Sequence, residues 1–197
     1  MKIGFYCESP ADQAAMAVFT EGILGQPLEP INMDLEAHSV PGFFAALDGV
    51  YRGVHYNSDA EGLIVVVDAD DSPLHGEAHD APGVWEQECR FCEIRKIIQR
   101  TGNQLKPRQG RSALKVAWGV AVPSIEAWYL AGKNHQVGEA AFWLDHRSSN
   151  RSERHDLFRR SRAENRVEPD HITRGINIHN HLMAVRELAK LTCPSFD

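Results

Sequence analysis

The clearest strand signal in the chain is the apolar run at 63–67, Leu-Ile-Val-Val-Val, in which no polar residue interrupts the apolar ones. Such a run is typical of a strand that is covered on both faces, as in the centre of a parallel sheet. It ends on three carboxylates, those of Asp68, Asp70 and Asp71. In open α/β sheets the working crevice lies at the carboxyl ends of the strands, so we expect chemistry here. The alternative is a polar loop in which Asp71 caps a helix.

Strands and amphipathic helices alternate along the chain as far as residue 131. Apolar runs predict further strands at 2–7, near 28–33 and at 114–122. Helical spacing of apolar residues predicts helices at 10–24, 41–51, 85–100 and 124–131. Ser9 and Pro10 are typical of a helix start, and Gly25 of a helix end. This alternation predicts an α/β fold, with a parallel sheet flanked by helices.

Beyond residue 132 the pattern changes to polar and helical segments. A short helix is expected at 138–144, a polar, Arg-rich tract at 147–166, and an amphipathic helix at 176–191. We therefore predict two parts. Residues 1–132 form the α/β domain, and residues 133–197 form an appended C-terminal helical lobe that packs on it.

The net charge of −6 conceals a strong asymmetry. Residues 1–89 carry two Lys or Arg against 16 Asp or Glu, a balance of −14, whereas residues 90–197 carry 19 against 11, a balance of +8. An acidic half could hold cations, and a basic half could meet a polyanion such as nucleic acid. The alternative for the basic segments is a solvated surface. The candidate phosphate contacts are Arg95, Lys96, Arg100, Lys106, Arg108, Arg111, Arg159, Arg160 and Arg162.

Apolar content and cysteine usage limit the class of protein. No apolar run approaches the roughly 20 residues of a membrane span. The first residues read as a strand and lack the long apolar core of a signal peptide. Four cysteines do not suggest a disulfide scaffold in a chain of 197 residues. We expect a cytoplasmic protein with reduced thiols and no membrane contact.

Two predicted strand ends carry carboxylates. Glu8 follows the first strand and Asp68 and Asp70 follow the central one, while Asp12 lies one helical turn beyond Glu8. Carboxylates that gather without a basic neighbour raise one another's pKa unless a divalent cation neutralises them. Mg²⁺ favours oxygen ligands and substrate phosphates, and two such ions would suit phosphodiester displacement. Mn²⁺ would serve the same ligands.

The Glu within Glu-Ser-Pro-Ala-Asp at 8–12, followed by Asp-x-Asp after a Val-rich strand, resembles the Toprim domain. This domain occurs in topoisomerases, bacterial-type primases, overcoming-lysogenization-defect nucleases and small nucleases that mature ribosomal RNA. The segment 121–131, Ala-Val-Pro-Ser-Ile-Glu-Ala-Trp-Tyr-Leu-Ala, is similar to Toprim-like proteins of unknown function found beside bacterial anti-phage systems. The resemblance covers about residues 1–132.

The resemblance implies that Glu8 is a metal ligand or general acid/base. It also implies that Asp68 and Asp70 bind metal and that Asp12 is a ligand of a second site. Glu126 is a further candidate ligand because it starts a helix just past a strand end; alternatively, it only favours the helix N-terminus. The family's Glu is often followed by Gly, whereas Ser9 stands here, which narrows the approach of a phosphate to the backbone.

These features together predict a Mg²⁺-dependent nuclease, a phosphodiester hydrolase acting on DNA or RNA, as part of a defence or toxin module. The alternative is a non-catalytic or latent subunit that binds metal, nucleic acid or a partner ATPase within a larger complex. The chain has no Gly-x₄-Gly-Lys-Ser/Thr loop of its own, so a separate protein would supply the ATPase. A homodimer is a further expected partnership.

A second set of residues has metal-ligand spacing, His75-x₃-His79-x₉-Cys89-x₂-Cys92. Both cysteines fall within the helix predicted at 85–100. Cysteines three residues apart in a helix often pack as small apolar residues. We therefore expect packing here rather than bound zinc.

Overall fold

The computed structural model describes residues 1–31, 33, 39–70, 72–81, 86, 88–130, 156–157 and 159–160, apart from the side chains of 129 and 130. Residues 1–13 and 27–120 form one compact unit, and residues 14–26 belong with those from 121 onward in another. The predicted helices at 138–144 and 176–191, and most of the Arg-rich tract, lie outside the described residues. No helix in the described part of the chain is long and apolar enough to cross a membrane.

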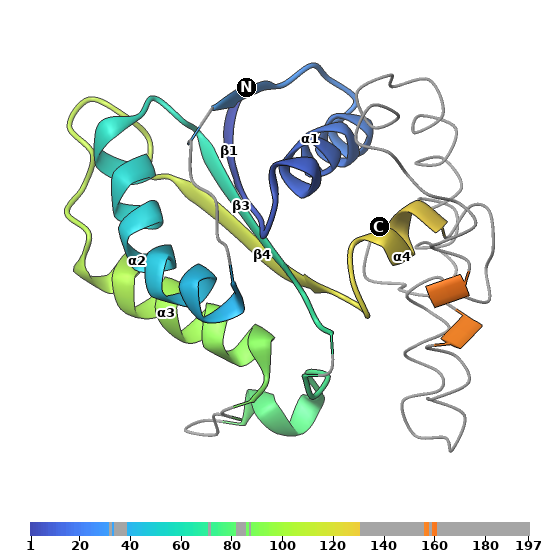
Figure 1. The fold of residues 1–197 in the computed structure, drawn as a ribbon. Coiled ribbons are helices and arrows are strands. Elements are labelled where there is room, and N and C mark those ends of the chain that lie inside the picture. The colour runs from blue at the N-terminus through green and yellow to red at the C-terminus, as the bar shows by residue number, and fades with distance from the viewer. Residues whose placement is uncertain are drawn as a thin grey trace. The chain divides into compact units, whose positions relative to one another are not determined.

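The first unit is built on a four-stranded parallel sheet with helices against it, which confirms the predicted α/β fold (Figure 1). The order of the strands across the sheet is β2-β1-β3-β4. In the register between the two central strands, Ile3 pairs with Gly62 and Tyr6 with Val65. The strands are β1 (Lys2–Tyr6), β2 (Glu29–Ile31), β3 (Gly62–Asp68) and β4 (Lys115–Ala121).

Two long helices pack side by side against one face of this sheet (Figure 1). They are α2 (Val40–Asn57) and α3 (Arg90–Gln104). Phe43 and Leu47 of α2 and Ile94 of α3 are fully buried in the same core as Leu63 and Val65 of β3. The remaining described elements are α1 (Pro10–Leu24), a 3₁₀ turn η1 (Glu77–Asp80) and the short α4 (Glu126–Leu130).

Local capping explains why two of these helices begin where they do. The Ser9 hydroxyl accepts the Asp12 amide at 3.2 Å, as expected for the start of α1. Ser39 accepts the Gly42 amide at 3.2 Å at the start of α2. Gly25 ends α1 with a φ of 65°, a left-handed conformation that glycine adopts without steric cost. The predicted boundaries of α1 are therefore confirmed.

The prediction for the third helix was wrong at both ends. It was expected at 85–100, but α3 runs from Arg90 to Gln104, and Cys89 is its N-cap residue. Gly102 lies within the helix, where a Cβ would meet the hydroxyl oxygen of Tyr51 at 3.4 Å. Ile97, Ile98 and other α3 side chains bury their apolar face against α2, and this packing sets the helix position more strongly than local signals do.

A polar contact joins α2 to α3 beside this core. Asp48 accepts a hydrogen bond from Thr101 Oγ1 at 2.5 Å and from Arg52 Nε at 2.9 Å. The hydrogen bonds from Arg52 and Thr101 hold the pKa of Asp48 below its usual value. The carboxylate form of Asp48 therefore stabilises the folded chain at neutral pH.

We expect Asp48→Asn to lower the free energy of unfolding by about 1 kcal/mol at pH 7. The Asn side chain has an NH₂ group in place of one carboxylate oxygen, and this group cannot accept the hydrogen bonds that Thr101 and Arg52 donate. A lowered pKa gives stability that is present above the unfolded-state pKa and is lost as pH falls through the folded-state value. The stabilities of the variant and the wild type should therefore converge as the pH falls below the folded-state pKa of Asp48. Urea unfolding across pH measures this, with Glu93→Gln as a control because its nearest cation, Lys96, is 3.9 Å away. A pH-independent difference would contradict it.

Candidate functional site

The carboxyl ends of β1 and β3 lie next to each other at the point where the strand order reverses. From β1 the chain crosses to β2 on one side, and from β3 it crosses to β4 on the other. In open α/β sheets, ligands bind in the crevice at such a switch point. Glu8 follows β1 and Asp68 ends β3, so the sequence-predicted carboxylates stand at this point of the sheet.

Glu8 turns toward the end of β3. Its Oε1 accepts the backbone amide of Asp68 at 2.9 Å, a bond between residues 60 positions apart in the chain. Its side chain is 23% exposed, and burial raises the pKa of Glu8 above its usual value. The Asp68 amide and the Arg90 charge oppose this rise, whereas Asp70 and Asp12 add to it. Glu8 is thus a half-buried carboxylate that holds its proton more readily than an exposed one.

Arg90 lies among these carboxylates, where the sequence analysis expected no basic neighbour. Its Nη1 is 2.9 Å from Asp70 Oδ2 and 3.8 Å from Glu8 Oε1, and it also donates to the backbone carbonyl of Asp68. Only 15% of the Arg90 side chain is exposed. A cation in the first turn of a helix is opposed by the helix dipole, so these acceptors hold Arg90 in place. The site therefore pairs carboxylates with one guanidinium.

The other predicted carboxylates are placed less uniformly. Asp12 accepts the Ser9 hydroxyl at 2.8 Å at the start of α1, and it is near enough to Glu8 to raise the pKa of that residue. Asp70 has a φ of 44°, the left-handed region, directly after the strand. Asp71 lies outside the described residues. Glu126 starts α4 as expected and accepts the Ser124 hydroxyl at 2.6 Å, but it belongs to the other unit.

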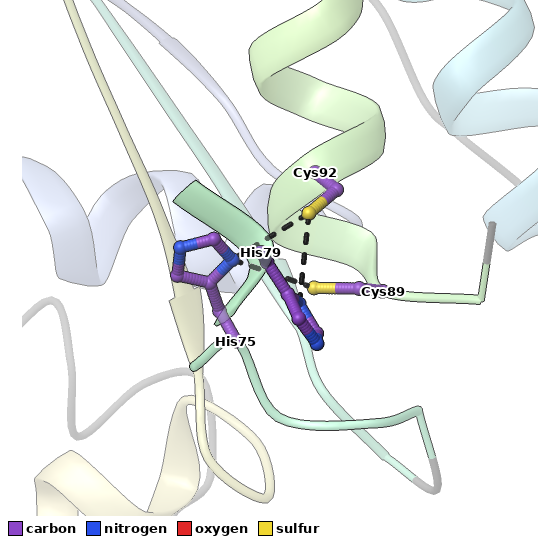
Figure 2. A group of neighbouring side chains, drawn as sticks. All are labelled: His75, His79, Cys89 and Cys92. Atoms are coloured by element: carbon purple, nitrogen blue, oxygen red, sulfur yellow. Dashed lines mark hydrogen bonds between the residues drawn. The ribbon is translucent and has the colours of Figure 1, made fainter. Parts of the chain in front are cut away.

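Within the described part of the chain, the side chains whose donor atoms converge as a potential metal site are His75, His79, Cys89 and Cys92 (Figure 2). One donor atom from each lies within 4.8 Å of the others. The His75 Nδ1 atom is 3.8 Å from the sulfur of Cys89 and 3.5 Å from that of Cys92, and His79 Nδ1 is 3.7 Å from Cys92 Sγ. The first unit therefore contains a candidate metal-binding cluster of two nitrogens and two sulfurs.

Three elements bring this cluster together. His75 precedes η1, His79 lies within it, Cys89 is the N-cap residue of α3, and Cys92 lies in the first turn of that helix. Both cysteines are buried and unpaired, and burial raises the pKa of the Cys89 thiol. The expectation that both cysteines lie inside a helix was wrong for Cys89. As the N-cap residue it presents its sulfur beside that of Cys92 (Figure 2).

A second layer of side chains surrounds the cluster. His75 Nε2 is 3.1 Å from Asp80 Oδ1, and the His75 ring lies 4.4 Å from the ring of Phe91. Arg95 pairs with Asp80, donates to the His79 carbonyl at 2.8 Å and approaches Cys92 Sγ at 3.7 Å. These contacts fix the His75 ring and place a positive charge beside a cluster sulfur.

The predicted phosphate contacts divide into two groups. The side chains of the first group donate hydrogen bonds within the protein. Arg95 donates to the His79 carbonyl, Arg108 donates to the Ala60 and Ser58 carbonyls at 2.7 Å, and Arg111 donates to the Ser58 carbonyl. The second are more exposed: Lys96 at 54% and Arg100 at 56%, whose nearest carboxylates are 3.9 Å away. Lys106 and Arg160 are exposed, Arg159 pairs with Asp156, and Arg162 lies outside the described residues.

We call the carboxyl ends of β1 and β3, with Glu8, Asp68 and Asp70, the carboxylate edge. The residue that sequence reasoning missed there is Arg90. The sequence contained a sign of this role, since Arg90 is the first basic residue after a stretch of 89 residues that contains only two Lys or Arg.

Comparisons of the chain with protein-family models, with curated proteins and with solved structures found no match.

Proposed function

We propose that the chain is a Mg²⁺-dependent phosphodiester hydrolase acting on nucleic acid. The observation that carries the proposal is the meeting of Glu8 with the end of β3 at the switch point of the sheet, together with Arg90. The donor chemistry fits the ion, because Asp68 and Asp70 offer carboxylate oxygens at the end of β3, next to Glu8 after β1. We assign the ion to Asp68 and Asp70, with Asp12 beside them, and the proton of the attacking water to Glu8. Mn²⁺ suits the same oxygens.

When bound, Mg²⁺ would polarise a phosphate oxygen and stabilise the charge that develops on it. Arg90 would hold the phosphate, since a guanidinium offers a planar pair of donors that matches its oxygens. Its contact with Asp70 keeps it aimed at the carboxylate edge before substrate arrives. Glu8 would take the proton of the attacking water on Oε2, while its Oε1 stays on the Asp68 amide. A raised pKa makes Glu8 a stronger base than an ordinary carboxylate.

Nucleic acid is the substrate class favoured by the charge distribution. Lys96 and Arg100 are one turn apart on α3 and remain largely exposed, so they are available to backbone phosphates. Such contacts increase affinity without reading the base sequence. A role in a defence or toxin module is part of this proposal and rests on the resemblance of the motifs at 8–12 and 63–71 to Toprim nucleases.

The test is cleavage of labelled single-stranded and duplex DNA and RNA by the purified full chain with Mg²⁺, Mn²⁺ or EDTA. We expect cleavage that requires the divalent ion. Asp68→Ala and Asp70→Ala should each reduce it at least about tenfold, because even the outer partners of metal ligands cost 10–100-fold. Asp59→Ala, which removes an exposed carboxylate paired with Lys2, is the control. A wild-type chain that cleaves none of these substrates would defeat the proposal.

A second candidate function is a latent subunit that becomes active within a larger complex. The pairing of Arg90 with Asp70 and Glu8 favours it, because a guanidinium already offsets the charge that an ion would neutralise. Ser9 in place of the usual glycine points the same way. Mn²⁺ binding that appears only after a co-purified protein is added would support this function over the first.

A further inference from the structure

We propose that His75, His79, Cys89 and Cys92 form a structural zinc site that ties the segment after β3 to the start of α3. The proposal is independent of the hydrolase function, because no residue of the cluster belongs to the carboxylate edge. It rests on the identity of the four donors, on their distances and on the side chains that surround them.

The donor set selects the metal class. Two sulfurs and two imidazole nitrogens are typical of Zn²⁺, whereas Mg²⁺ and Ca²⁺ take oxygen. Around a tetrahedral Zn²⁺, with Zn–S about 2.3 Å and Zn–N about 2.0–2.1 Å, neighbouring donor atoms lie about 3.3–3.8 Å apart. The three measured N···S distances, 3.5, 3.7 and 3.8 Å, agree with this spacing.

The surroundings are those of a metal site. A histidine ligand usually donates its other ring N–H to a carboxylate, a backbone carbonyl or water, which fixes its tautomer and ring orientation. His75 directs Nδ1 into the cluster and Nε2 to Asp80 at 3.1 Å. Arg95 approaches Cys92 Sγ at 3.7 Å, so a positive charge faces one of the sulfurs that would bind as thiolate. Four protein donors close the coordination shell, which is the mark of a structural site.

The position of the site determines which parts of the chain a bound zinc ion would hold together. The segment 72–81 contains one element of regular structure, the 3₁₀ turn η1, and none of its residues is buried. Zinc would bind this segment to α3 at Cys89, the residue next to Arg90. It would thereby fix Arg90 beside Asp70 and Glu8, so that the cluster positions the guanidinium of the carboxylate edge.

The test uses the full chain, loaded with ZnCl₂ and dialysed, and measures its metal content by mass spectrometry. We expect one zinc per chain, and with CoCl₂ an absorption spectrum of tetrahedral cobalt with thiolate charge transfer. Cys92→Ser should lower zinc affinity about tenfold or more. Cys7→Ser is the matched control, because Cys7 is equally buried but lies outside the cluster.

A second variant keeps the proposal falsifiable if Cys92→Ser does not fold. His79→Cys retains four ligands, so it should keep zinc and increase the cobalt–thiolate absorption. Three results would overturn the site: no zinc in the loaded wild type, unchanged zinc affinity in a folded Cys92→Ser, or a Cys89–Cys92 disulfide formed with zinc present. Zinc binding without any cleavage of nucleic acid leaves this proposal standing and defeats only the hydrolase.

Discussion

Removal of zinc with a strong chelator is expected to lower the melting temperature of the chain by about 8–16 °C. An ion held at about 1,000 times its dissociation constant adds about 4.1 kcal/mol to the folded state. For a chain of 150–250 residues, each kcal/mol shifts the melting temperature by about 2–4 °C. The cluster also joins segments separated in the chain, so its loss releases the residues around η1.

The measurement is thermal unfolding by circular dichroism before and after chelation, and after ZnCl₂ or MgCl₂ is restored. Zinc should recover the melting temperature and magnesium should not, because the donors are sulfur and nitrogen. Limited proteolysis should show new cleavage in 72–81 after chelation. Cys92→Ala, which lacks one ligand, should melt below the zinc-loaded wild type, and zinc should raise its melting temperature less than that of the wild type. Equal melting temperatures for the loaded and the chelated wild type would contradict the expectation.

The four residues of the cluster follow Asp68 and Asp70 along the chain, so the segment from β3 to α3 carries both the cluster and part of the carboxylate edge. Asp68 ends β3 and Asp70 lies two residues beyond it, His75 and His79 follow, and Cys89 directly precedes Arg90. A metal bound at the cluster would reduce the freedom of the segment that carries the polar side chains of the edge. A preorganised guanidinium then costs little to align when a phosphate binds.

Much of this fold was predictable because its signals are local. The apolar run at 63–67 identified the central strand, and Ser9 and Gly25 marked both ends of α1. Placement of carboxylates at two strand ends followed from the same runs. That Glu8 bonds the amide of Asp68 could not be seen, because it depends on the pairing of β1 with β3.

The errors concern features that tertiary contacts decide. The start of α3 was placed five residues too early, and this put Cys89 inside a helix and favoured packing over metal binding. The spacing of the two histidines and two cysteines was visible in the sequence, but their convergence depends on how residues 75–79 lie against the start of α3. Arg90 was missed as a site residue because its partners lie 20 or more positions away.

Glu8→Gln is expected to reduce cleavage by about 10²–10⁴-fold, the usual contribution of a general base. The amide keeps an oxygen for the Asp68 N–H, so the local structure is retained while the base is lost. In the wild type, the rate should rise with pH as Glu8 loses its proton. Because burial raises the pKa of Glu8, this rise should lie above pH 4.5. The variant should lack this limb.

Glu8→Gln should reduce cleavage without reducing the stability of the folded chain, so the two measurements separate a catalytic effect from a folding defect. A carboxyl with a raised folded-state pKa stabilises the chain most below its unfolded-state pKa of 4.5, and this contribution is lost as pH rises through the folded-state value. Glu8→Gln removes the loss, so at pH 7 without metal the variant should be at least as stable as the wild type. Cleavage rates from pH 4 to 9 and urea unfolding at pH 7 test both statements, with exposed Glu61→Gln as control. A fully active Glu8→Gln would show that another group takes the proton.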